Sequence, residues 1–298
     1  MADTRSFVAG SYGLMLDEKP CGFLRRVEGG GVSADVINEK ASQDHLVRKH
    51  IGQPKYEDFT IEVGLDMAKP FWDWITDSLS MKYVRKSGAI VAYSYDLVAQ
   101  SQREFHDAII TEVTFPALDG GSKEPGYLKV KFSPYLTQLK KATGKATVTR
   151  SKHKMFMASN FKLQIQGLDC TKVMKIDSFT VKQHVEQLAV GERRNFEQAI
   201  GTMDFPNLKI SMSSAHADPW QEWFHKFVID GNSGEEAEKN GVLTLLSSNQ
   251  HDELASIKLM HLGIFRLAED AATSNESIHK ITADLYCEEM RFDPPTGE

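Results

Sequence analysis

The chain has 298 residues, of which 41% are hydrophobic and 26% charged, and its formal net charge is -6. This composition is typical of globular proteins and excludes a disordered chain, while the length allows for two ordinary domains. No apolar run reaches the roughly 18 residues that a membrane span requires. The mild negative charge lacks the basic excess that is typical of nucleic-acid binders. The three cysteines are scattered, so neither a disulfide framework nor a zinc cluster is indicated.

The first half of the chain predicts a β-rich unit with one helix. Alternating apolar residues predict strands around Leu14 and over residues 59–63. Proline opens the helix at Pro70, where its missing N–H group is tolerated. The apolar side of this helix carries four residues at helical spacing: Phe71, Trp74, Ile75 and Leu79. Further strands are expected over residues 89–95, 104–115 and 127–132.

The second half repeats this order of elements. With Pro70 placed on Pro219, an offset of 149 residues aligns residues 56–75 with 205–224 without a gap, and Trp74 meets Trp223. We therefore expect a fold that is mainly β with one helix per domain, built as two tandem β-barrel or β-sandwich domains. The expected boundaries are domain 1 at 1–136, a linker at 137–154 and domain 2 at 155–298.

Two polar stretches are expected to lie outside regular elements. The linker is rich in Lys and Thr, which predicts a solvated and mobile connection. Residues 37–55, with their counterpart 186–204, predict a long loop within each domain, and such loops are usually functional. We expect the first loop to contact other subunits or stacked rings through one group of residues: Asp44, His45, Leu46, Val47, Arg48, Lys49 and Ile51.

The sequence contains no motif that indicates catalysis. Nucleotide-binding, zinc-protease and nucleophile-elbow patterns are absent. The histidines are dispersed, and Glu288 and Glu289 are expected on a solvated strand edge. The tryptophans lie at helical spacing, which indicates core packing. We therefore expect no catalytic residue, no cofactor and no metal.

The first half resembles the tail tube proteins of contractile-tailed phages and of phage-like contractile injection systems. The resemblance covers about 120 residues and depends mainly on six of them: Gly52, Pro54, Tyr56, Trp72, Trp74 and Ile75. The second half matches this family more weakly and is recognised chiefly as a repeat, through Pro219, Trp220 and Trp223.

This resemblance implies a structural, ring-forming subunit of a tube, as a tail tube protein, a tube initiator or a hub. Three chains would give six domains in pseudo-sixfold symmetry, and a hexamer of chains is a close competitor. The implied partners are adjacent tube, baseplate or sheath proteins, with nucleic acid or effector cargo only as material in the lumen. We expect a chain made in the cytoplasm that becomes part of a phage-like particle.

Two other classes of function remain open at this point. An oligomeric ligand-binding β-module would require a concave aromatic pocket, whereas the aromatic residues lie at helix-core spacing. A hydrolase with a dispersed active site would leave no motif in the sequence.

Overall fold

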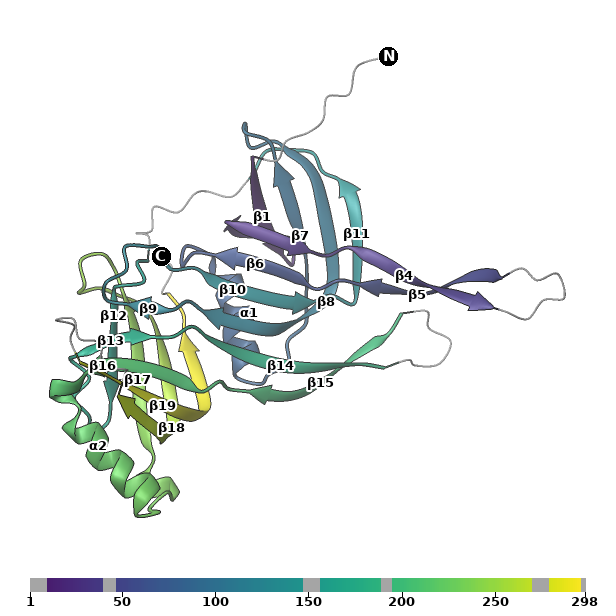
Figure 1. Ribbon diagram of the computed structural model, residues 1–298. Helices are drawn as coiled ribbons and strands as arrows, with labels where there is room; N and C mark the ends of the chain where they lie inside the picture. Colours follow the sequence, from purple (N-terminus) through teal and green to yellow (C-terminus); the bar gives the residue numbers. More distant parts are fainter. Residues whose placement is uncertain (1–9, 40–46, 147–155, 189–194, 270–278, 296–298) are drawn as a thin grey trace.

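The computed structural model describes residues 10–39, 47–146, 156–188, 195–269 and 279–295 (Figure 1). Antiparallel strands make up most of these residues, and each half of the chain contributes one α-helix. The predicted fold class, mainly β with a helix in each half, is confirmed. Within the described ranges, no helix has the length and apolar character needed to cross a membrane.

The first half of the chain contains helix α1 (Lys69–Leu79) and a series of strands. These are β1 (Ser11–Leu16), β2 (Lys19–Leu24), β3 (Arg26–Gly29), β4 (Val32–Glu39), β5 (Arg48–Tyr56), β6 (Phe59–Val63), β7 (Lys86–Tyr93), β8 (Ala99–Phe115), β9 (Leu118–Asp119), β10 (Leu128–Ser133) and β11 (Leu136–Lys141). The main sheet has the order β2-β1-β7-β8-β10-β6-β3, and β11 also pairs with β8.

The second half contains helix α2 (Asp218–Phe224), which continues into a π-helical turn (His225–Ile229). Short 3₁₀ turns precede and follow it at Ser214–His216 and Glu235–Ala237. The strands are β12 (Phe161–Ile165), β13 (Val173–Ile176), β14 (Phe179–Leu188), β15 (Glu197–Asp204), β16 (Leu208–Ser213), β17 (Lys239–Leu246), β18 (Glu253–Glu269) and β19 (Lys280–Asp293).

The two halves have the same strand order. The sequence β1-β7-β8-β10-β6-β3 in the first half corresponds to β12-β17-β18-β19-β16-β13 in the second. A 17-residue strand runs through the middle of each sheet, β8 in one and β18 in the other. The single strand β19 occupies the place that β10 and β11 share beside β8. Corresponding residues of the halves therefore have corresponding neighbours in the sheet.

The halves are not separate bodies joined by a free linker. Strand β14 of the second half pairs with β8, and β9 of the first half pairs with β13. The predicted linker is wrong at its start, because residues 137–141 belong to β11. The buried Thr137 hydroxyl donates a hydrogen bond to the Gly30 carbonyl, while the lysines of β11 face solvent and give the segment its polar composition. Residues 147–154 of the predicted linker lie outside the described residues.

Both helices bury the aromatic side that their spacing predicts. Trp72, Trp74 and Trp220 are almost completely buried, and Trp223 is 6% exposed. The indole N–H of Trp74 donates to the Val84 carbonyl, and that of Trp223 donates to the Ala237 carbonyl, each at 3.2 Å. The aligned tryptophans therefore perform the same task in each half: each fills the core and satisfies a backbone carbonyl after its helix.

Replacing Trp74 with Ala should lower the free energy of unfolding by about 3–5 kcal/mol, because the substitution leaves a cavity and an unpaired carbonyl. Trp223→Ala should have an effect in the same range. Thermal or urea melting measures both, with His50→Ala as a control on an exposed strand. A Trp74→Ala variant that melts like the parent protein would contradict this structural role.

Candidate assembly interface

The joint between the halves is a continuation of one sheet into the other. Residues Phe179 to Lys182 of β14 pair with residues Phe115 to Glu112 of β8 in an antiparallel register. The hydroxyl groups of Thr114 and Thr180 lie 2.9 Å apart across this pairing. Backbone hydrogen bonds thus supply the attachment, which is the mode by which an extended segment adds to an exposed sheet edge.

Aromatic side chains fill the space beneath this pairing. Phe115 stacks on Phe179 with ring centroids 5.0 Å apart, and it also lies 5.7 Å from Phe292 of β19. Trp72 of α1 contacts the other side of Phe292, again at 5.7 Å. All four side chains are at most 4% exposed. The joint is therefore a hydrophobic core shared by both halves.

The hairpin β14–β15 is fixed to the first half at a second place. Arg85 donates to the backbone carbonyl of Gln198. The Gln198 side-chain amide donates to the Ser133 hydroxyl at 2.9 Å and to the Pro134 carbonyl at 3.2 Å. Because Gln198 is only 6% exposed, these bonds are made away from water.

The hairpin β4–β5 is the counterpart of β14–β15 but lies free on the surface. Four of its apolar side chains are more than half exposed: Val32 (55%), Val36 (60%), Ile37 (55%) and Ile51 (73%). Ion pairs cross it from Asp35 to Lys55 and from Glu39 to His50. The expectation of a loop at residues 37–55 and 186–204 is therefore wrong where the structure describes these segments. β-Branched residues on facing strands stabilise a hairpin instead.

The structure describes part of the predicted contact group. Asp44, His45 and Leu46 lie outside the described residues, whereas Val47 is half exposed and Arg48, Lys49 and Ile51 lie at the start of β5. Three of the family-like positions continue that strand: Gly52, Pro54 and Tyr56. Whether these residues contact another subunit stays a prediction.

A groove of about 430 Å³ opens on the first half. Its lining contains no tryptophan and includes Tyr12, Phe59, Arg103 and Leu139. Leu139, on the edge strand β11, is 69% exposed.

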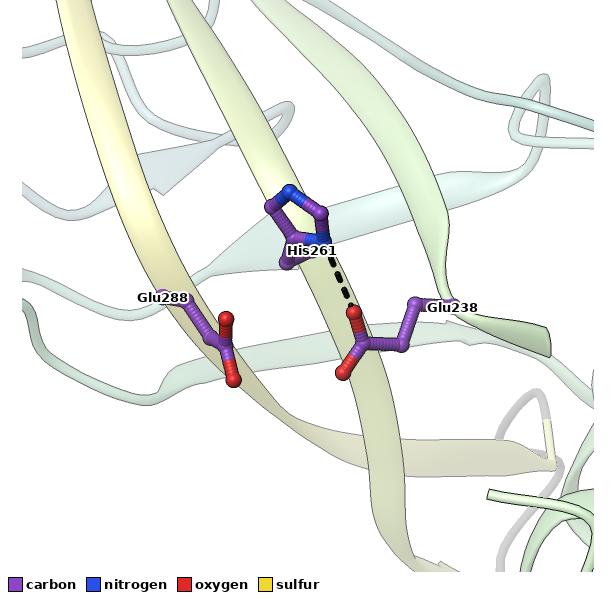
Figure 2. Close-up of side chains that lie close together, drawn as sticks. All are labelled: Glu238, His261 and Glu288. Atoms are coloured by element: carbon purple, nitrogen blue, oxygen red, sulfur yellow. Dashed lines mark hydrogen bonds and ion pairs between the residues drawn. The ribbon is translucent and has the colours of Figure 1, made fainter. Parts of the chain in front are cut away.

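The structure also brings together a polar cluster on β18 and its neighbours that the sequence analysis missed. Figure 2 shows His261 directed toward Glu238, with Glu288 on the adjacent strand. Their ligand atoms lie within 4.8 Å of one another. The Glu238 carboxylate accepts hydrogen bonds from the Tyr286 hydroxyl at 2.7 Å and from the His261 ring at 2.9 Å. These bonds use both of its oxygens and connect β18 and β19 to the residue preceding β17.

The cluster changes the pKa of two of its members. The hydrogen bond to Glu238 holds the pKa of His261 above its ordinary value of 6.5, and the negative charges of Glu288 and Glu235 act in the same direction. Burial and the Glu238 carboxylate raise the pKa of Tyr286. The spacing of these residues along the chain carries no signal, because only antiparallel strand pairing brings them together.

Replacing Glu238 with Gln should lower the pKa of His261 toward 6.5, which an NMR titration of the imidazole protons measures directly. A raised folded-state pKa stabilises the fold below pH 6.5, and this stabilisation is lost as the pH rises through the raised value. The difference in Tm between the parent protein and the variant should therefore be largest below pH 6.5. Glu289→Gln is the matched control, because Glu289 pairs with Arg291 instead. An unchanged His261 titration in Glu238→Gln would contradict the assignment.

Comparison with protein families matches residues 12–132 to the T4-like virus tail tube protein gp19. None of the curated proteins compared with the chain matches it. Among solved structures, the chain is similar to one from the sheath–tube complex of PVC, an extracellular contractile injection system, in its extended state. That likeness has 17% identity and a TM-score of 0.40, and it covers 47% of this chain and 95% of that chain.

Two further structures show a likeness of similar extent. A chain of the anti-feeding prophage cap, which terminates the AFP tube, has 16% identity and a TM-score of 0.42, with 48% of this chain and 95% of that chain covered. A chain of the PVC sheath/tube terminator has 18% identity and a TM-score of 0.40, with 47% and 99% covered.

The matched residues contain the first-half sheet from β1 to β10 together with α1 and the β4–β5 hairpin. This is the part of the chain in which the sequence resemblance was found, and it includes all six residues on which that resemblance depends. Residues 12–132 therefore match the T4-like virus tail tube protein family, which is the family that the sequence resemblance indicates.

Proposed function

We propose that this chain is a ring-forming subunit of the central tube of a contractile, phage-tail-like particle. In this proposal residues 1–141, which include β11, and residues 155–298 act as two tube-like domains, and three chains close a ring of six domains. Adjacent tube, baseplate or sheath proteins are its partners, and nucleic acid or effector cargo passes only through the lumen.

The joint within the chain is the observation that carries this proposal. One half offers the edge of β8 and the other half offers β14, so the two contacting surfaces are different. Contacts between unlike surfaces leave one of each kind free at the ends of the pair, and repetition of such contacts closes a ring when the rotation permits. Because both halves have the same strand order, a second chain can repeat the joint.

The arrangement of the hairpins supports stacking of such rings. Figure 1 shows β4–β5 and β14–β15 extending to the same side of the molecule, opposite to α2. In a ring, every domain would then present a hairpin to the same neighbouring ring. Exposed apolar side chains on β4 and β5 favour burial in such a contact.

The mass of the purified assembly tests this proposal. Native mass spectrometry should find closed units of three chains of 33.4 kDa, and negative-stain images of the same sample should show rings of uniform bore. Rings that contain six chains in a single layer would reject the three-chain arrangement. A protein that stays monomeric at all concentrations and with its neighbouring tube proteins would reject the function.

Deleting residues 44–49 should leave a folded protein that forms rings but no longer stacks them. The deletion removes the first two residues of β5 and leaves the strands of the core in place. Sedimentation velocity separates single rings from stacks, and circular dichroism checks folding. Unchanged stacking would remove this hairpin tip from the assembly.

A further inference from the structure

We infer that the outer edge of β18, at residues 263–269, binds strand β4 of a second copy of this chain, as β8 binds β14 within one chain. This inference deepens the proposed ring and rests on it. It names the two surfaces that meet between chains and the register in which they pair.

The edge of β18 is open where the edge of β8 is occupied. In the first half, β7 pairs with β8 as far as Ala108, and β14 continues along the same side from Glu112 to Phe115. In the second half, β17 pairs with β18 as far as Leu262. In the part of the chain that the structure describes, residues 263–269 then pair only with β19, on the opposite side. A sheet edge of this length is a ready template for another strand.

Strand β4 is the element that matches this edge. It lies 149 residues before β14 in the aligned halves, so Val32 corresponds to Val181. Val181 pairs with Val113 and is 1% exposed, whereas Val32 is 55% exposed. Equivalent valines are therefore buried in the half where the strand pairs with a sheet edge and exposed in the half where it does not.

A second pair of equivalent residues shows the same contrast. Phe292 pairs with Ile257 of β18, and Leu139 pairs with Arg103 of β8, which is the equivalent position in the first half. Trp72 covers Phe292, which is 2% exposed, whereas Leu139 is 69% exposed beside the groove of about 430 Å³. The surface around Leu139 in the first half is therefore exposed, whereas the equivalent surface around Phe292 in the second half is buried in the joint.

The partner is a second copy because the two surfaces cannot meet within one chain. Figure 1 places β18 and β4 on opposite sides of the molecule. One chain therefore carries the open edge of β18 and the exposed strand β4 on opposite sides. Each copy can bind a neighbour on either side, which is the contact that a closed ring requires.

The register follows from the alignment of the two joints. In the first half, Val113 of β8 pairs with Val130, which pairs with Ile61. In the second half, Leu267 of β18 pairs with Ala283, which pairs with Ile210, the counterpart of Ile61. Leu267 is therefore the counterpart of Val113, whose partner on the other side is Val181. Val32 of one copy should therefore lie opposite Leu267 of the next. Residues directly opposite each other in antiparallel strands have Cα atoms roughly 4.5–5.5 Å apart, which is within reach of a disulfide.

Mixing the full-length variants Val32→Cys and Leu267→Cys under a mild oxidant tests this register. A crosslink between the two variants can form only between copies, and we expect it as a doubled band on a non-reducing gel. Val32→Cys mixed with Glu253→Cys is the matched control, since Glu253 is exposed at the other end of β18. Absence of the 32–267 crosslink, or an equal yield with Glu253→Cys, would overturn the inference.

A charge substitution separates this joint from the ring itself. Val32→Asp should abolish ring closure, whereas Val36→Asp should leave ring closure intact. Only the first four residues of β14 pair with β8, and Val36 lies beyond the equivalent stretch. Both side chains are exposed, so both variants should melt like the parent protein. If Val32→Asp still forms rings and the cysteine variants give no 32–267 crosslink, the joint is rejected and the proposed function stands. If the parent protein forms no rings and the cysteine variants give no crosslink, both are rejected.

Discussion

The structure depends on the length of one strand. Strand β8 has 17 residues, but its neighbour β7 pairs with it only as far as Ala108, so that residues 109–115 have no partner on that side from the first half. Strand β14 of the second half pairs with Glu112 to Phe115. Because unpaired N–H and C=O groups in a buried place are unfavourable, this pairing determines how the halves are oriented. The aromatic core of Trp72, Phe115, Phe179 and Phe292 can form only once the strands have met.

The same geometry gives the chain two unlike ends. The second half has a long strand, β18, and a shorter neighbour, β17, as the first half does, and its excess length has no partner among the described residues. At the other end, β4 and Leu139 lie exposed where their counterparts are buried. In the proposed ring such a chain is the repeating unit, and the contact between chains repeats the type of joint that β8 and β14 form within one chain.

The repeat made the fold largely predictable from the sequence. The aligned prolines and tryptophans located both helices, and apolar alternation located most strands. The β4–β5 hairpin was mistaken for a loop because β4 is solvated on both faces, so that no burial pattern marks it. In β14 the alternation of buried residues stops after Gln183, before the segment 186–204 that was taken for a loop. Strand β11 was mistaken for linker for a similar reason, since its lysines hide the buried Thr137.

The candidate interface was less predictable than the fold. Residues 44–51 were predicted from loop length and from apolar residues among charged ones. The edges of β8 and β18 become visible only when strand lengths and partners are known. Long-range pairing also explains why the cluster of Glu238, His261 and Glu288 left no trace in residue spacing. The sequence carried one signal of the open edge: the strand expected over residues 104–115 is longer than the strand expected over residues 89–95.

A reconstruction of the assembled ring by electron microscopy tests the central claim most directly, because it shows whether the joint inside the chain is repeated between chains. The account predicts threefold symmetry, six similar domains, and a sheet that continues from β18 of one chain into β4 of the next. A ring in which neighbouring chains meet through other surfaces, or in which β18 keeps a free edge at residues 263–269, would contradict it.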